Sequence, residues 1–121
     1  MKRIILMLIA AIMALTLMAC GKSEAAQSVD DMISNLEIVD ENSRAALEEA
    51  ETAYNALNDK DKGSLENYAQ LEEARSAFNQ LMADKAISAI DWIGAVNENS
   101  WNDIHNARQI YDALTDTEQE L

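Results

Sequence analysis

The residue with the most distinctive chemistry is Cys20, the only cysteine of the chain, because it directly follows an uncharged, apolar run at residues 4–19. Lys2-Arg3 precedes that run, and polar residues follow the cysteine. A positive start, an apolar centre and a small residue before a break form the layout of an export signal. The run is shorter than the roughly 20 apolar residues that a spanning helix needs. We therefore expect residues 1–19 to be a signal peptide that is removed.

The sequence Leu17-Met18-Ala19-Cys20 resembles the lipobox of bacterial lipoproteins, although Met18 is a less usual middle residue. In that family the cysteine thiol receives a diacylglyceryl group, and a lipoprotein signal peptidase then cuts just before it. The resemblance implies that Leu17, Met18 and Ala19 are recognised by this peptidase. It also implies that Cys20 carries the lipid, with acyl chains such as palmitate, as the first residue of the mature protein. The alternatives are a buried unpaired cysteine and an ordinary secretory signal cut near Ala19.

Lipidation would explain why an exported chain holds one odd thiol, since a single cysteine cannot form an internal disulfide. Two acyl chains are enough for stable membrane attachment, so we expect a protein on the outer face of the bacterial cell membrane. The small and polar residues at 20–28 predict a lipidated cysteine followed by a flexible tether. No other cofactor is expected.

The charge of the mature chain limits its partners. Without Lys2 and Arg3, seven basic residues face 22 acidic ones, for a net charge of −15. Nucleic acid is excluded as a partner because phosphate binding depends on clustered Lys and Arg. Anionic headgroups would also repel this surface, so membrane contact is expected through the lipid anchor alone.

An all-α fold is expected for the rest of the chain, which has no proline and only two glycines after residue 21. Apolar residues recur at three and four positions, as on amphipathic helices. Ser28 is expected to cap a helix at 29–39, and Ser43 a second helix that ends near Leu57. Asn58 is a start signal for a third, which continues as one long helix of about thirty residues, bent near Asp84 or Gly94. Ser100 is expected to cap a last helix that ends near Leu114.

Two segments of the chain match each other when one is shifted by 57 residues. Ten identities fall in the 27 positions from 33 to 59, including the shared sequence Glu-Asn-Ser at 41–43 and 98–100. The apolar stripe of Leu47, Ala50, Tyr54 and Leu57 becomes Ile104, Ala107, Tyr111 and Leu114. The match predicts a first helical repeat at 29–84 and a partial second repeat at 85–121.

The repeat resembles one found in Gram-positive surface proteins, with Ile90, Ile93-Gly94, Val96, Ser100, Ala107-Arg108, Tyr111-Asp112 and Leu114-Thr115 as its matching positions, and Asn67-Tyr68 opening the third helix. The first copy departs from the pattern with Glu37 and Glu51. The resemblance implies three-helix-bundle units that serve as stalks or interaction modules, without enzymatic activity.

The second repeat looks incomplete, because Thr115 and Glu118 form a capping box for a helix that does not follow. Its apolar stripe needs a cover. We expect either that the last helix folds back along the long helix, or that a homodimer or an envelope protein covers the stripe. Trp92 and Trp101 also belong to this repeat, so Trp92, Trp101, Ile104 and Tyr111 form the candidate interaction surface.

Catalysis is not expected. His105, the only histidine, has no nucleophile, metal cluster or phosphate loop beside it in the sequence, and paired glutamates on amphipathic helices are normally solvated. The sequence is therefore interpreted as a lipid-anchored surface protein that acts as a non-catalytic binding or spacer module. The alternatives are a lipoprotein that captures a small ligand and a truncated remnant of a larger surface protein.

Overall fold

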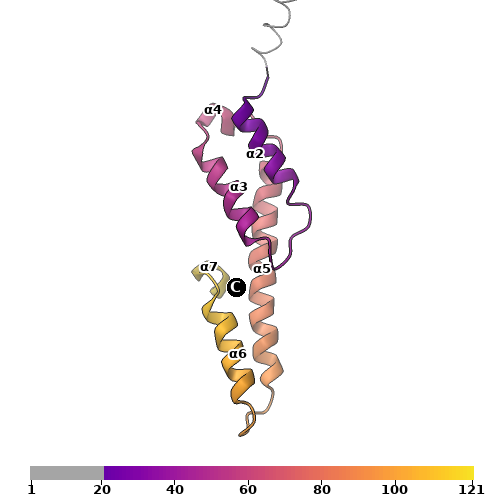
Figure 1. The fold of residues 1–121 in the computed structure, drawn as a ribbon, viewed down its shortest axis with the longest axis vertical. Helices are drawn as coiled ribbons and strands as arrows, with labels where there is room; N and C mark the ends of the chain where they lie inside the picture. The colour runs from indigo at the N-terminus through magenta and orange to yellow at the C-terminus, as the bar shows by residue number, and fades with distance from the viewer. Residues whose placement is uncertain (1–20) are drawn as a thin grey trace, which may run out of the picture.

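The computed structural model describes residues 21–121, and every regular element in this range is a helix (Figure 1). The predicted all-α fold is confirmed. The helices are α2 (Glu24–Ser34), α3 (Arg44–Ala56), α4 (Asp59–Lys62), α5 (Tyr68–Ile93), α6 (Trp101–Asp112) and α7 (Asp116–Gln119). Across the described residues, no helix combines the length and the apolar character that crossing a bilayer requires.

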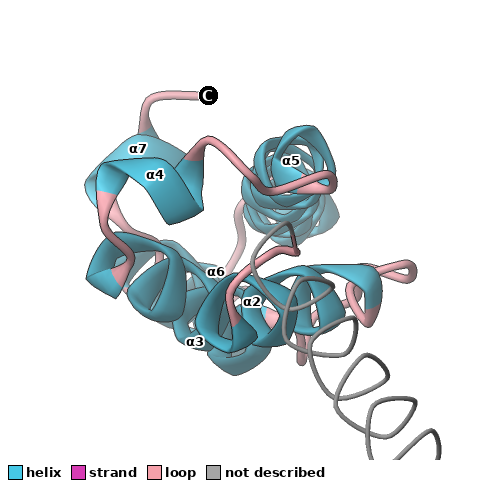
Figure 2. Ribbon diagram, turned by 90° about the horizontal axis from the view of Figure 1, so that it is seen from above, coloured by secondary structure: helices cyan, strands magenta, loops and turns pink. Residues whose placement is uncertain are grey.

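Helix α5 is the spine of the molecule. Helices α2 and α3 lie beside its first half, and α6 and α7 lie beside its second half (Figure 1). Seen from above, α2 and α3 lie side by side and α5 runs along one side of them (Figure 2). The described body is elongated, with the start of α2 at one end and the loop at 94–100 at the opposite end (Figure 1).

The main core lies where α2, α3 and the first half of α5 meet. Its centre is Phe78, which is fully buried. The core consists of Val29, Ile33, Leu36, Leu47, Ala50, Leu57, Leu71, Ala74 and Phe78. These residues come from the apolar stripes of three amphipathic segments, so the burial of these stripes holds the segments together.

Helix α2 begins earlier than expected. Ser23, rather than Ser28, is its cap, and the Ser23 hydroxyl accepts a hydrogen bond from the Ala26 N–H at 3.1 Å. Residues 24–28 are therefore helical, and the expectation of a flexible tether is wrong for them. The reason is that Ala26 is a good helix former and is fully buried, one turn before Val29. The helix also ends at Ser34, five residues before the expected end.

The third and long helices are separate elements. Asn58 does cap a helix, by accepting a hydrogen bond from the Asp61 N–H, but α4 has only four residues and ends at Gly63. Helix α5 then runs unbroken for 26 residues. It stops at Gly94, whose φ of +56° and ψ of −135° a residue with a side chain rarely adopts.

The capping box of Thr115 and Glu118 is present, and it opens the one-turn helix α7. The expectation that no helix follows this box is wrong. Helix α6 folds back along α5, and α7 contacts α5 as well. Fold-back of the last helix, one of the two expected arrangements, is therefore observed.

Candidate interaction surface

The predicted lipidation residue Cys20 and the recognition residues Leu17, Met18 and Ala19 lie outside the described residues. The described chain starts directly after them, at the end of the body where α2 begins (Figure 1). A group attached at Cys20 would therefore leave the body at this end. We call it the N-terminal end, and the opposite one, with the loop at 94–100, the distal end.

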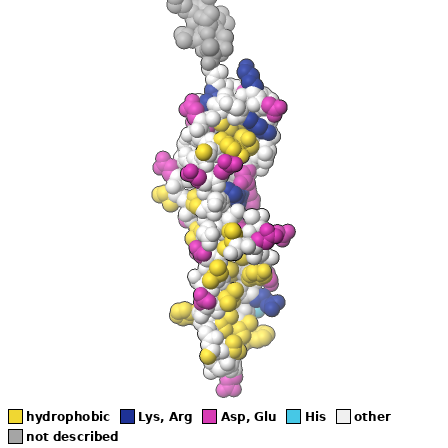
Figure 3. Space-filling view, turned by 180° about the vertical axis from the view of Figure 1, so that it is seen from behind, with side chains coloured by type: hydrophobic (Ala, Val, Ile, Leu, Met, Phe, Trp, Pro, Cys, Tyr) yellow, Lys and Arg dark blue, Asp and Glu magenta, His cyan; other side chains and the backbone are white. Residues whose placement is uncertain are grey.

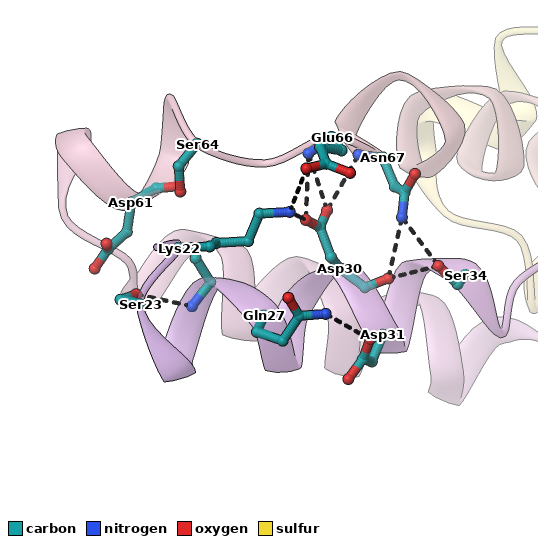
Figure 4. Close-up of polar contacts among 11 residues, drawn as sticks. Lys22, Ser23, Gln27, Asp30, Asp31, Ser34, Asp61, Ser64, Glu66 and Asn67 are labelled. Carbon is teal, nitrogen blue, oxygen red and sulfur yellow. Dashed lines mark hydrogen bonds and ion pairs between the residues drawn. The ribbon is translucent and has the colours of Figure 1, made fainter. Parts of the chain in front are cut away.

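A buried carboxylate fastens the N-terminal end (Figure 4). Asp30 is 3% exposed and accepts hydrogen bonds from the backbone N–H of Glu66 at 3.2 Å and of Asn67 at 3.1 Å. The Lys22 ammonium also pairs with it. Burial acts to raise the pKa of Asp30, but the hydrogen bonds from Lys22, Asn67 and Glu66 outweigh burial and hold this pKa below its ordinary value. Asp30 thus joins α2 to the start of α5.

The sequence repeat is also a structural repeat. Before α3, the Asp40 N–H donates to the Ser43 hydroxyl at 2.9 Å, and the Asn42 N–H donates to the Asp40 carboxylate at 2.8 Å. Before α6, the same two bonds recur 57 residues later, at 3.0 Å and 2.8 Å, with Asn97 in place of Asp40. The turn that leads into α6 therefore copies the turn that leads into α3.

Equivalent positions of the two repeats differ strongly in burial. Ile33 is fully buried on α2, whereas its counterpart Ile90 on α5 is 49% exposed. Leu47 is fully buried on α3, whereas its counterpart Ile104 is only half-buried. In the first repeat the start of α5 covers this face, and none of the described residues covers it in the second.

The uncovered face forms an open groove between α5 and α6, which we call the α5–α6 groove. A cavity of about 370 Å³ lies in it and is lined by Ile90, Ile93, Ile104, Ala107, Arg108, Tyr111 and Asp112. A smaller cavity of about 80 Å³ continues it towards α7 and shares Ile90 and Tyr111. Two predicted surface residues, Ile104 and Tyr111, therefore lie together in one apolar groove.

The two tryptophans are not part of that groove. Trp92 is 80% exposed and Trp101 is 73% exposed, on either side of the distal loop, and neither lines the cavities of the groove. The Trp101 ring lies near His105, with 6.5 Å between ring centroids. The predicted interaction surface therefore divides into an apolar groove and an exposed aromatic tip.

Apolar side chains gather on the distal half of the body, as the space-filling view shows over its lower part (Figure 3). Large exposed hydrophobic residues of the described chain are Ile38, Ile87, Ile90, Trp92, Val96, Trp101, Tyr111 and Leu121. Only Ile38 belongs to the first repeat. Exposed apolar groups gathered on one part of a protein commonly mark interaction sites.

A second buried carboxylate joins the two repeats. The Glu118 side chain on α7 is fully buried and forms an ion pair with Arg44 on α3, whose Nη2 donates to both carboxylate oxygens at 3.0 Å. Burial acts to raise the pKa of Glu118, while the Thr115 backbone N–H and the Arg44 guanidinium bring it below its ordinary value. The Arg44 guanidinium also lies 5.0 Å from the Phe78 ring centroid, over the main core.

A larger cavity of about 540 Å³ opens between α3, α5 and α7. Tyr54 and Tyr68 stack in its wall at 4.6 Å between ring centroids. A hydrogen bond to the Glu72 carboxylate is the main cause that raises the pKa of Tyr68 to about 12. Arg75 forms a bidentate pair with Glu51 at 2.6 Å, so these two charged residues of the lining are already paired.

The described residues contain no cluster of three or more His, Cys, Asp or Glu side chains that could hold a metal ion. His105 is exposed. The groove and the tip offer apolar contact and scattered charge.

Sequence reasoning missed three features of these surfaces. It did not identify Ile87, which is 48% exposed beside the groove, or the buried roles of Asp30 and Glu118. The repeat carries a signal for the first two, because Ile87 is the counterpart of Asp30 and the replacement of an acid by isoleucine marks a changed environment. No sequence signal connects Glu118 with Arg44, which lies 74 residues away.

Comparison of the chain with protein-family models, with curated proteins and with solved structures gives no significant match.

Proposed function

We propose that this protein is a lipid-anchored bacterial surface protein whose helical body acts as a non-catalytic binding or spacer module. Cys20 carries a diacylglyceryl group, and Leu17, Met18 and Ala19 direct cleavage just before it. The short segment between Cys20 and Glu24 connects the lipid to α2. The body then stands on the outer face of the membrane and presents its distal half to other envelope components.

The observation that carries the proposal is the uneven distribution of apolar surface relative to the anchor. Asp30 joins α2 to α5 at the end nearest Cys20, whereas the large exposed hydrophobic residues lie mostly in the distal half. Monomeric soluble proteins rarely expose large apolar patches without an interaction that uses them. A binding role at a distance from the membrane follows from this arrangement.

Replacement of the lipidated residue tests the anchor. Cys20→Ser in the full chain should move the protein from the membrane fraction to the soluble or secreted fraction and abolish its labelling by a fatty-acid analogue. Ser23→Ala is a matched control, because it alters a nearby serine and leaves the thiol intact. A Cys20→Ser protein that stays in the membrane fraction would contradict the proposal.

Capture of a small ligand is the second candidate, and the cavity beside Tyr54 and Tyr68 favours it. Its volume of about 540 Å³ is in the range of ligand pockets, and its wall has aromatic faces. A ligand that binds there should raise the melting temperature. Tyr68→Leu should abolish this rise, while Trp101→Leu, at the distal end, should leave it unchanged. A rise that survives Tyr68→Leu would place the ligand elsewhere.

A further inference from the structure

The first repeat shows what normally covers the face that lies open in the second. The start of α5 rests on α2 and α3, and its Asn67 side chain donates to the Ser34 hydroxyl at 2.9 Å. Further along, Arg75 pairs with Glu51 on α3. The covered face of α2 is thus marked by Asp30, Ile33 and Ser34, and that of α3 by Leu47, Glu51 and Tyr54.

The same positions in the second repeat define the open face. With the shift of 57 residues, the three α2 positions correspond to Ile87, Ile90 and Asp91 on α5. The three α3 positions correspond to Ile104, Arg108 and Tyr111 on α6. Ile87, Ile90 and Tyr111 are 48%, 49% and 42% exposed. The α5–α6 groove is therefore equivalent to the face of the first repeat that binds the start of α5. Among the described residues, no helix occupies it.

The α5 rim of the groove carries an acid, and the α6 rim carries a base next to Asp112, which also lines the groove. Asp91 lies on the α5 rim and Arg108 lies on the α6 rim, and both side chains are exposed. Among the ion pairs of residues 21–121, none uses either of them. In the first repeat the α3 position holds Glu51, which pairs with Arg75 of the covering helix. Arg108 stands at the equivalent position of α6, so an acid is the complementary partner there.

We propose that a second copy of this chain occupies the α5–α6 groove. A two-fold axis parallel to α5 sets the α5 rim of one copy against the α6 rim of the other, so Asp91 meets the partner's Arg108 twice. The second half of α5 and α6 of both copies then form four helices whose neighbours are antiparallel, an arrangement that buries apolar faces well. Ile87, Ile90, Ile104 and Tyr111 lie in the shared centre.

The orientation of this pair also suits two copies on one membrane, a point that rests on the proposed function. An axis parallel to α5 leaves both N-terminal ends pointing in the same direction, so both lipids can enter the same bilayer. Anchoring in one plane raises the effective concentration of one copy for the other. That increase helps the pair to form against the mutual repulsion of two acidic bodies.

Cross-linking between two differently tagged full chains tests the pairing of the rims. One copy carries Asp91→Cys and the other Arg108→Cys, and a short bis-maleimide reagent is added to whole cells. We expect a cross-linked product that contains both tags. The parent chain controls for any reaction at Cys20, and a Glu41→Cys pair, on the first repeat, controls for random collision. A yield equal to that of the Glu41→Cys pair would overturn the proposal.

Charge reversal gives a second readout that does not depend on new cysteines at the rims. Asp91→Arg alone and Arg108→Asp alone should each lower the amount of dimer captured by amine-reactive cross-linking about tenfold. The double variant should restore it, because both pairs are re-formed with the charges exchanged. Both positions are exposed, so circular dichroism should show an unchanged fold in all three variants. Singles that equal the parent would count against the proposal.

The outcomes separate this proposal from its premise. A two-tag product in the soluble fraction would support the dimer and contradict the lipid anchor. Membrane-bound chains without such a product would support the anchor and contradict the dimer. Capture of a different protein by Asp91→Cys, with no product between copies, would assign the groove to a foreign helix and overturn the proposal.

Discussion

The two repeats share a sequence pattern and the same turn before their second helix, yet one is closed and the other is open. Ile33 and Leu47 are fully buried in the first, while Ile90 and Ile104 at the same positions of the second are partly exposed. The difference does not come from the apolar stripe itself, which both repeats keep. It comes from the covering helix, because the start of α5 covers only the first repeat.

The apolar stripe that both repeats share specifies which face of each helix pair is apolar, and the rest of the chain decides what packs against this face. Helix α5 serves both repeats, as the cover of the first and as the first helix of the second. The second repeat is therefore the part of the molecule that can still bury apolar surface against a partner.

Truncation of the equivalent stripe residues should give the largest contrast. Leu47→Ala removes a fully buried side chain and should cost about 3 kcal/mol of unfolding free energy, whereas Ile104→Ala should cost about 1 kcal/mol. Urea unfolding followed by circular dichroism at low protein concentration measures both. Equal losses would mean that the second repeat is as well covered as the first.

Loss of the buried carboxylate of Asp30 should give the second-largest decrease in unfolding free energy. Asp30→Ala leaves the N–H groups of Glu66 and Asn67 without their acceptor and should cost about 2 kcal/mol. Hydrogen exchange at these two amides should speed up. Asp31→Ala, at an exposed neighbour, is the control and should change neither quantity by much. If the exchange rates of these two amides do not change in Asp30→Ala, the hydrogen bonds to Asp30 do not stabilise the start of α5.

The two glycines should respond differently to a methyl group. Gly94→Ala forces a side chain into a positive-φ conformation and should cost about 1 kcal/mol. Gly63 has φ of −69°, and an added Cβ would make ordinary contact with the Asp59 carbonyl at 3.4 Å. Gly63→Ala should therefore stay within about 0.5 kcal/mol of the parent protein. Thermal unfolding of both variants checks this, and the opposite ranking would contradict the assigned geometry of the distal loop.

Acid should weaken the carboxylate contacts of both repeats by a smaller amount. The pKa values of Asp30 and Glu118 are lowered by folding, from ordinary values of 3.8 and 4.5. Their stabilisation is therefore fully present above these values and is lost as the pH falls through the lower folded pKa. The difference in melting temperature between the parent and Glu118→Gln should shrink between pH 7 and pH 3. A difference that is constant over this range would contradict the lowered pKa of Glu118.

The exposed tryptophans should contribute least to stability. Trp92→Ala and Trp101→Ala should each change the unfolding free energy by less than about 0.5 kcal/mol, because both side chains are mostly in solvent. In the parent protein, fluorescence should show emission typical of water-exposed indole. A blue-shifted emission that depends on protein concentration would indicate that association buries the distal tip as well.

Periodicity and capping residues predicted most of the fold. The helices after Ser43 and Ser100, the Asn58 cap and the Thr115 capping box were visible because they depend on local chemistry. Ser43 and Ser100 stand at the expected cap positions, but neither makes a side-chain capping hydrogen bond. The start of α2 was missed because alanine gives a weak apolar signal, although Ala26 is fully buried. The break between α4 and α5 was missed because apolar spacing continues across it.

The candidate surface was predicted only in part. The repeat pointed to Ile104 and Tyr111, which do share a groove, but it grouped them with Trp92 and Trp101, which lie outside it. A residue type alone does not reveal which side of a helix is covered. The Arg44–Glu118 pair depends on how α7 returns to α3, a long-range contact that no local pattern encodes.

The unbroken course of α5 has a further consequence, which concerns height above the membrane. A helix of 26 residues is about 39 Å long, because each residue adds about 1.5 Å. For a body anchored at its N-terminal end, the length of α5 then sets the largest distance between the bilayer and the distal tip. On the proposed anchoring, a component that meets this tip lies near that level, and adding two turns to α5 would change which layer of the envelope the tip reaches.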